Sequence, residues 1–461
     1  MSTLDDQTVC RVPRRRIVVA SMVGTTIEFY DFYIYATAAV TVFPHLFFPR
    51  GNPTTALLAS LATFGLAFVA RPIGSILFGH FGDRVGRKAT LVGSLLTMGI
   101  ATFVVGLLPT YQHIGVAAPL LLAILRFAQG LALGGEWSGA ALLAAETAEP
   151  DKRARAAMWP QLGAPFGFLL ANGIFVILIS WLGHSNTKLD PHGPFLTWGW
   201  RIPFLLSAVM VAIGLYVRLR LTETPVFARS LERDELVRAP LVMVFRANWR
   251  ELLIGTFVML ATYTLFYTGT TWALSYGTSK RPPAGTGLGF GYMEFLHFQL
   301  IAVLFFAAMV PIAGVLADRF GRRRTLLVVT AAIIVYGASF GVMLTPDSAT
   351  TGSTLLFLVI GMTLMGLSFG PMSAVLPELF PTNVRYTGSG VSYNMASILG
   401  AAVAPFIATW LATRHGVAWV GVYLMVAAVL TFIALWVMKE TKDISLDAPV
   451  AEHVDDTVHP G

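Results

Sequence analysis

Five ionisable residues lie deep inside apolar stretches of the sequence: Glu28, Asp31, Arg71, Arg126 and Glu136. A charged side chain at the centre of a bilayer costs roughly 2.5 to 3.5 kcal/mol on insertion scales, so such residues normally face a partner or a water-filled cavity. A carboxyl group kept from water can bind and release a proton, and a guanidinium group can hold a carboxylate through two hydrogen bonds. The five residues therefore predict chemistry with protons and organic anions.

The positions of these charges along their helices suggest how they pair. Glu28 and Asp31 are three residues apart and are expected on one helix face. Glu28 matches Arg71 in depth from one membrane surface, while Asp31 is closer in depth to Arg126. We therefore predict these two ion pairs, which leave one carboxylate of the three without a cation to carry the proton. The alternative is a structural polar network that holds the helices together.

The composition places these residues in a membrane. The chain has 461 residues, of which 55% are hydrophobic and 12% charged, whereas a soluble protein has about 25% charged residues. Apolar runs of about 20 residues, each long enough to cross a bilayer, recur from end to end. We predict an all-α integral membrane protein with twelve transmembrane helices at 17–43, 54–81, 89–108, 117–146, 156–182, 199–217, 251–277, 291–317, 325–344, 354–376, 388–413 and 417–438.

The basic residues predict the orientation. Lys and Arg number 32 against 25 Asp and Glu, and they concentrate in the tails and in the loops on one side. The loops on the other side contain only Arg50, Lys188, Lys280, Arg281 and Arg414. This bias predicts a multi-pass protein of the inner (plasma) membrane with both termini cytoplasmic, and it explains the positive charge without a nucleic-acid partner. The apolar stretch after "RRR" at 14–16 is too long for a signal peptide and contains two acids, so we interpret it as the first span.

The chain divides into two similar halves. The longest polar stretch, 221–250, separates a six-helix half at 1–220 from a second half at 251–440, and a cytoplasmic tail follows at 441–461. Between the second and third spans of each half lies one loop sequence, "GHFGDRVGRKATL" from Gly79 and "GVLADRFGRRRTL" from Gly314. Such a repeat indicates two parallel six-helix bundles.

The repeated loop has a physical rationale as a gate. Glycine at its start permits close helix approach, and the later glycine permits a tight turn. The aspartates are placed to accept hydrogen bonds from arginines and from helix N-termini of a neighbouring bundle, which would form a breakable cytoplasmic latch. The alternative is a basic anchor at the membrane surface. The predicted gating residues are Gly79, Asp83, Arg84, Gly86, Arg87, Gly314, Asp318, Arg319, Gly321 and Arg322.

These loops resemble the cytoplasmic loop motif of the major facilitator superfamily, and "LRFAQG" at 125–130 resembles its fourth-helix motif. The stretches "EFYDFYIY", "FVARPIGSILFGHFGDRVGRK", "RFAQGLALGGEWSGA", "LTETPVF" and "PELFPTNVRYTGSG" together resemble the metabolite:proton symporter family. That family includes carriers for 2-oxoglutarate, citrate, shikimate and proline or glycine betaine. The resemblance implies two pseudo-symmetric six-helix bundles and proton-coupled import of a small organic acid or zwitterion by alternating access.

Four further residues are candidates for the substrate site beside Arg71 and Arg126. Tyr263 and Tyr267 lie on the aromatic seventh span, and Gln161 and Asn394 bring amides into the fifth and eleventh spans. Helix packing is the alternative for all four. Glu294 and His297 lie near the outer end of the eighth span, and we interpret them as interfacial.

Other function classes fit less well. A proton-driven exporter would be expected to carry Gly-Pro followed by a glycine pair on the fifth span, whereas this chain reads "GAPFGF" at 163–168. A membrane sensor would be expected to append a signalling domain, and only a short tail follows Lys439. The sequence has no catalytic constellation, metal-ligand spacing or P-loop, so we predict no enzyme activity, no metal and no cofactor except the proton as coupling ion. We expect the protein to act as a monomer.

Overall fold

The computed structural model describes residues 14–48, 52–85, 87–134, 150–182, 193–219, 240–283, 285–381 and 384–442, with a few isolated positions at 137–148 and at 444. The elements found there are helical. In the first half they are α1 (Arg14–Thr41), α2 (Phe43–Leu46), α3 (Pro53–Val85), α4 (Arg87–Leu107), α5 (Tyr111–Ile114), α6 (Ala117–Leu133), η1 (Pro150–Lys152), α8 (Arg153–Gln161), α9 (Gly163–Leu182), η2 (Phe195–Gly199) and α10 (Arg201–Leu219). In the second half they are α12 (Pro240–Ala247), α13 (Trp249–Tyr267), η3 (Thr268–Trp272), α14 (Ala273–Thr278), α15 (Tyr292–Phe320), α16 (Arg322–Ala338), α17 (Phe340–Met343), α18 (Thr351–Phe369), α19 (Met372–Glu378), α20 (Arg385–Ser397), η4 (Ile398–Ala402), α21 (Ala404–His415) and α22 (Val417–Val437).

The predicted membrane spans agree with these helices to within a few residues. Within the described ranges, nine helical segments are long and apolar enough to cross a membrane. The shorter apolar helices α4 and α6, and the 28-residue α1 with its two acids, occupy the remaining predicted spans. The predicted continuation of the fourth span beyond α6 falls largely on residues that the structure does not describe. Each predicted apolar run therefore corresponds to a helix in the described part of the chain.

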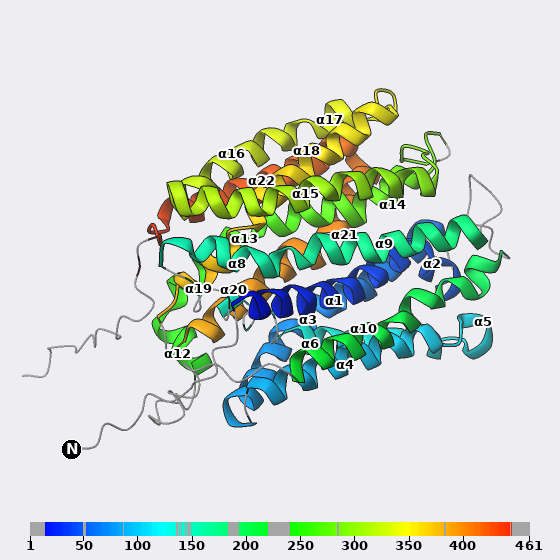
Figure 1. The fold of residues 1–461 in the computed structure, drawn as a ribbon. Helices are drawn as coiled ribbons and strands as arrows, with labels where there is room; N and C mark the ends of the chain where they lie inside the picture. The colour runs from blue at the N-terminus through cyan, green and yellow to red at the C-terminus, as the bar shows by residue number, and fades with distance from the viewer. Residues whose placement is uncertain are drawn as a thin grey trace, which may run out of the picture.

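Two six-helix bundles lie side by side, one built from the blue to green helices and the other from the green to red helices (Figure 1). Equivalent helices pack together in each bundle. The packing of α3 on α6 and of α4 on α10 in the first half matches that of α15 on α18 and of α16 on α22 in the second. This repeated packing is the pseudo-symmetry that the duplicated loop predicts.

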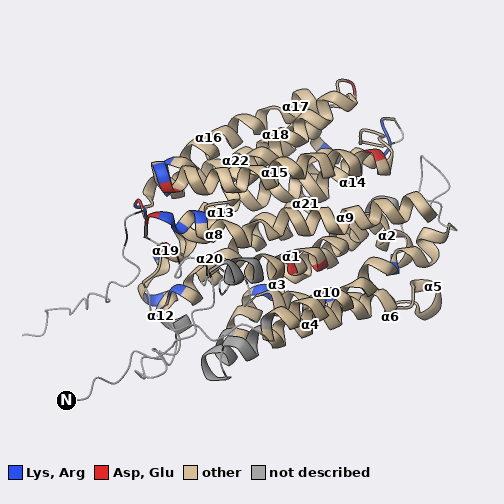
Figure 2. Ribbon diagram, viewed as in Figure 1, with Lys and Arg blue, Asp and Glu red and all other residues tan. Residues whose placement is uncertain are grey.

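One end of the molecule carries both ends of the described chain, Arg14 and Lys442, and is called the terminal face below (Figure 1). Basic and acidic positions gather mainly there (Figure 2), whereas the described middle of the bundle contains few charges, chiefly the acidic positions on α1 and the arginines on α3 and α6. Most of the predicted central loop lies outside the described residues, and its last part forms α12. Two long helices of the second half are interrupted by the π-helical turns η3 and η4, a local irregularity that often marks functional sites.

Candidate substrate and proton site

Two arginines from neighbouring helices converge on one aromatic ring of α1. The guanidinium carbon of Arg126 on α6 lies 4.4 Å from the centre of the Phe32 ring and 4.1 Å from that of Tyr35. The guanidinium carbon of Arg71 on α3 lies 4.9 Å from the same Phe32 ring and 4.8 Å from Phe68. Aromatic faces attract cations most strongly where water is excluded. Both predicted anion-binding residues therefore pack against the same ring, that of Phe32.

The guanidinium groups retain unused hydrogen-bond donors. Arg126 is fully buried, and its Nη1 donates to Oε1 of Gln129 at 3.1 Å. Its Nε and Nη2 are buried without an acceptor, and so is Nε of Arg71. A buried donor without an acceptor is costly, and more so when it is charged. A carboxylate placed beside these groups would accept from them in the bidentate geometry that guanidinium favours.

The second half supplies an aromatic wall to the same site. The Tyr267 ring lies 6.2 Å from Phe32, 5.3 Å from Phe68 and 5.9 Å from Phe64, measured between ring centres. Tyr263 packs on Tyr267 at 6.3 Å, and its buried hydroxyl has no hydrogen-bond partner. The structure thus brings four of the predicted substrate residues, Arg71, Arg126, Tyr263 and Tyr267, to one region between the halves.

Asp31 points away from this region, into the first bundle. Its side chain is 1% exposed, and neither carboxyl oxygen has a hydrogen-bond partner. The hydroxyls of Ser207 on α10 and Thr102 on α4 are the polar groups beside it. A carboxylate without a compensating charge or hydrogen bond is strongly disfavoured in such a setting. The pocket is therefore suited to a carboxyl group that carries a proton.

Of the two predicted ion pairs, the one between Asp31 and Arg126 is not formed in this structure. Arg126 contacts Gln129 and aromatic rings, and no ion pair joins it to Asp31. Glu28 lies near enough to Arg71 for a Coulombic interaction. A step of three residues turns a helix side chain by about 60°, so Glu28 faces the arginine side while Asp31 faces α4 and α10. The third predicted proton-coupling residue, Glu136, lies outside the described residues.

The side chains of Gln161 and Asn394 each form hydrogen bonds with residues of the opposite half. Gln161 on α8 donates to the Phe369 carbonyl at 2.9 Å and accepts from Trp137. Asn394 on α20 donates to the Ser75 hydroxyl at 2.6 Å and to the Gly134 carbonyl at 3.1 Å. Their amides, predicted to contact substrate, hold the halves together in this conformation. They lie between the arginine site and the terminal face.

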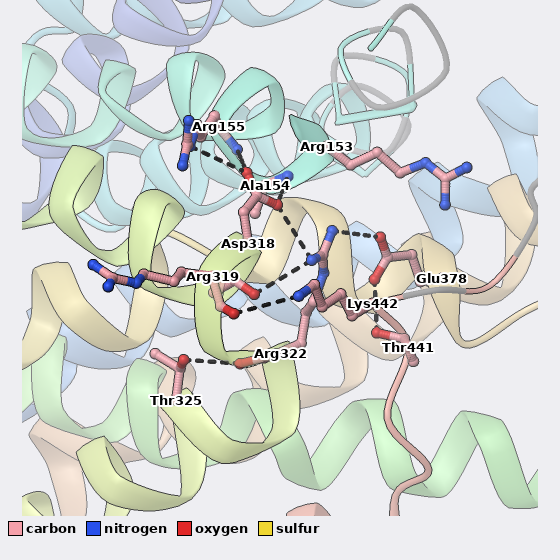
Figure 3. A network of polar contacts seen from close by, with 12 residues as sticks. Arg153, Ala154, Arg155, Asp318, Arg319, Arg322, Thr325, Glu378, Thr441 and Lys442 are labelled. Carbon is pink, nitrogen blue, oxygen red and sulfur yellow. Dashed lines mark hydrogen bonds and ion pairs between the residues drawn. The ribbon is translucent and has the colours of Figure 1, made fainter. Parts of the chain in front are cut away.

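The second copy of the repeated loop joins the two halves at the terminal face (Figure 3). Asp318, at the end of α15, accepts from the backbone N–H of Ala154 at 3.1 Å and of Arg155 at 3.0 Å. These N–H groups belong to the first turn of α8, in the opposite half, where the helix dipole favours an anion. The Asp318 side chain is 2% exposed, and its partner Arg155 lies 3.6 Å away. The predicted contact between an aspartate and a helix N-terminus of the other bundle is therefore present.

The remaining motif residues support this contact. Gly321 has φ of +98°, a backbone conformation that side chains disfavour, and it makes the turn between α15 and α16. A side chain at Gly314 would meet Met158 and the Ala154 carbonyl, which lie on α8. Arg322 pairs with Asp318 at 3.2 Å, whereas the predicted gating residue Arg319 is exposed.

In the first copy, Gly86 and the side chains of the other motif positions lie outside the described residues. Those positions are Gly79, Asp83, Arg84 and Arg87.

The chain end completes this network, and the sequence reasoning missed it. Arg322 also pairs with the buried Glu378 at 3.3 Å, and Glu378 accepts from the Thr441 hydroxyl at 2.6 Å. Glu440 accepts from the first N–H groups of α16, those of Arg322 and Arg323. The sequence did contain a signal for Glu378, because an acid follows the fourth predicted span in each half, Glu146 in the first and Glu378 in the second.

The first half also holds this chain end. Arg153, at the start of α8, donates to the Ile444 carbonyl. The described end of the chain therefore touches both halves at the terminal face.

The latch makes a testable prediction. Asp318→Asn removes the charge that holds the α8 N-terminus, and hydrogen bonds to charged groups contribute roughly 1.5 to 3 kcal/mol each, so we expect initial uptake to fall about tenfold or more. The measurement is uptake per amount of protein in the membrane. Asp347→Asn, at an exposed acid distant from the latch, is the matched control. Unchanged uptake in Asp318→Asn would rule out the latch.

The other candidates lie apart from the site. Glu294 and His297 are both exposed on the first turns of α15, as an interfacial position requires. Glu294 accepts from Thr351, and His297 hydrogen-bonds the Met293 carbonyl. In the part of the chain that the structure describes, no three His, Cys, Asp or Glu residues are placed to hold a metal ion.

Comparison with known proteins agrees with this architecture. The family model described as Major Facilitator Superfamily matches residues 21–398. The chain is 56% identical over 434 residues to the inner membrane metabolite transport protein YhjE of Escherichia coli K12, which covers 94% of this chain and 96% of the relative. It is 34% identical over 448 residues to the shikimate transporter of the same organism, covering 96% and 98%.

A solved structure shows the same fold. The xylose transporter XylE from E. coli, in a partially occluded inward-open conformation, superposes with a TM-score of 0.68. The match covers 94% of this chain and 99% of that one at 17% sequence identity. At this identity the likeness concerns the fold alone.

Proposed function

The chain belongs to the major facilitator superfamily, as a relative of its metabolite transporters, and we propose that it imports a small organic acid or zwitterion together with a proton. The terminal face would be cytoplasmic in the inner membrane, because the basic positions gather there. The protein would act as a monomer that exposes one central site alternately to each side.

The observation that carries this proposal is the pair of buried arginines. Arg71 and Arg126 both lie against Phe32, and both keep buried N–H groups without acceptors. A substrate carboxylate would satisfy these donors, and the aromatic side chains of Tyr35, Phe68 and Tyr267 would enclose a compact body behind it. Any substrate of this site should therefore carry a carboxylate, with or without a cationic group.

Asp31 is the proposed proton carrier. It has no ion pair, and its carboxyl oxygens are buried without hydrogen bonds in a pocket of the first bundle. Protonation removes the cost of that burial. We propose that Asp31 takes its proton from the outer side and releases it when the terminal face opens. Glu28, nearer to Arg71, would respond to the substrate instead.

The inter-half contacts supply the gate. Asp318 joins the halves at the terminal face, and the amides of Gln161 and Asn394 join them between that face and the arginine site. In this proposal, these contacts close the route from the site to the cytoplasm. Release of substrate to the cytoplasm would require all three contacts to break.

Transport in membrane vesicles tests the proposal. Right-side-out vesicles that contain the protein are given labelled shikimate, a dicarboxylate, an oxo acid and glycine betaine, with and without an imposed pH gradient. We expect at least one carboxylate compound to accumulate, and to accumulate more when the interior is alkaline. Uptake indifferent to the gradient would contradict proton symport. Efflux driven by an acidic exterior would indicate an exporter. The glycine betaine arm distinguishes a zwitterion carrier from a carrier of acids.

A further inference from the structure

Between Asp31 and Arg126 lie two neutral side chains that are already connected to each other. Gln129, one turn after Arg126 on α6, accepts from Arg126 Nη1 at 3.1 Å through its amide oxygen. Its amide nitrogen donates to the hydroxyl of Thr102 on α4 at 2.7 Å. Both Gln129 and Thr102 are buried. One side chain thus joins the anion-binding arginine to a hydroxyl that faces Asp31.

The Thr102 hydroxyl can respond to the charge of Asp31. It donates to the Met98 carbonyl at 2.8 Å while it accepts from Gln129. A neutral Asp31 carboxyl can donate its own proton to a neighbouring hydroxyl. An ionised Asp31 needs donors, and Thr102 can supply one only by turning its hydrogen away from Met98. That rotation also turns the lone pair of the Thr102 oxygen that accepts the hydrogen bond from the Gln129 amide.

We propose that Gln129 is a positioning residue that couples the proton on Asp31 to the orientation of the Arg126 guanidinium through Thr102. The inference rests on the proposed function, because it takes Asp31 as the proton carrier. When Asp31 loses its proton, Thr102 turns, the Gln129 amide shifts, and Arg126 loses the acceptor that fixes it for the substrate carboxylate. Release of the proton and release of the substrate then favour each other.

Few other charged side chains of the described residues lie near Asp31. On α1 itself the neighbouring ionisable side chains are Glu28 and Tyr30, and Tyr30 donates to the Pro203 carbonyl. Arg71 on α3 and Arg126 on α6 lie against the ring of Phe32, the residue after Asp31. On α10, Arg201 donates to the Gly106 and Leu108 carbonyls. Among the described residues, the chain through Thr102 and Gln129 is the hydrogen-bonded route from the Asp31 pocket to a cation.

Infrared titration of the substrate-free protein in lipid nanodiscs tests the proposal. The carbonyl band of a protonated carboxyl group is followed against pH, and the Asp31→Asn variant identifies the contribution of Asp31. We expect Gln129→Leu to move the titration midpoint of this band by about one pH unit, the effect of losing one hydrogen bond of ordinary strength. Thr102→Val, which keeps the shape of the side chain, should move it similarly.

The double variant and a control complete the design. Since Gln129 and Thr102 act in one chain, the double variant should shift the midpoint no further than the larger single effect. Asn172→Leu breaks the buried Thr37–Asn172 hydrogen bond between α1 and α9 and should leave the midpoint unchanged. If the Asp31 band titrates but its midpoint is unchanged in both Gln129→Leu and Thr102→Val, the coupling is overturned and proton symport is not. An Asp31 band that does not titrate overturns the proton carrier and this inference together.

Discussion

Arg126→Lys reduces initial uptake of the transported carboxylate by about a hundredfold or more, because lysine cannot reproduce the two-point contact of a guanidinium group. The Nε and Nη2 atoms of Arg126 are buried donors without an acceptor, and its guanidinium carbon lies 4.4 Å from the centre of the Phe32 ring and 4.1 Å from that of Tyr35. A compact ammonium would lose both the bidentate geometry and the stacking. Initial uptake by vesicles, normalised to the amount of protein, measures the effect.

Arg201→Lys is the matched control for this prediction. Arg201 is partly buried, lies 4.6 Å from the centre of the Trp200 ring and donates to the carbonyls of Gly106 and Leu108, but it is not part of the proposed substrate site. We expect its uptake to stay within about threefold of the unmodified protein, since lysine can keep one of those bonds. If Arg126→Lys transports as well as Arg201→Lys does, Arg126 does not hold the substrate.

Asp31→Asn abolishes accumulation against a concentration gradient but retains exchange of labelled for unlabelled substrate. Asparagine has nearly the same shape and cannot gain or lose a proton, so the neutral form is fixed. The carrier can still reorient with substrate bound, but no proton gradient drives it. Accumulation and exchange are measured on the same vesicles, with the ratio of the two as the result.

Exchange and accumulation lost together, with the protein absent from the membrane, would indicate a structural role for Asp31. Full accumulation by the variant would exclude Asp31 as the proton carrier. Asp151→Asn, at an exposed position near the terminal face, should behave as the unmodified protein does.

The helices and the loop motif could be predicted from the sequence because their causes are local. An apolar run of about 20 residues has to cross the membrane as a helix, so spans such as α15 and α22 were placed to within a few residues. Gly321 and Asp318 lie within one short motif, and the turn and the helix N-terminus that they require follow from general chemistry. The contacts of Glu440 and Thr441 arise from the return of the chain end, which no local pattern encodes.

The charge pairing could not be predicted because depth gives only one coordinate. Glu28 and Asp31 have suitable depths for Arg71 and Arg126, but the rotation of α1 and the path of each side chain decide which groups meet. Phe32 lies against both arginines, while Asp31 lies beside Ser207 and Thr102. Similarly, Gln161 and Asn394 were recognised as membrane amides, but only the packing of the two halves shows that each has a partner across the interface.

The chain end that closes over the terminal face makes a natural position for a reporter. Arg153 of the first half binds the Ile444 carbonyl, while Glu440 and Thr441 bind the second half. A fluorophore attached at residue 444 would therefore lie between the two halves, and its fluorescence would change as they separate. Fusions joined before Glu440 would instead remove the cap from α16, so the choice of junction decides whether a tagged carrier still cycles normally.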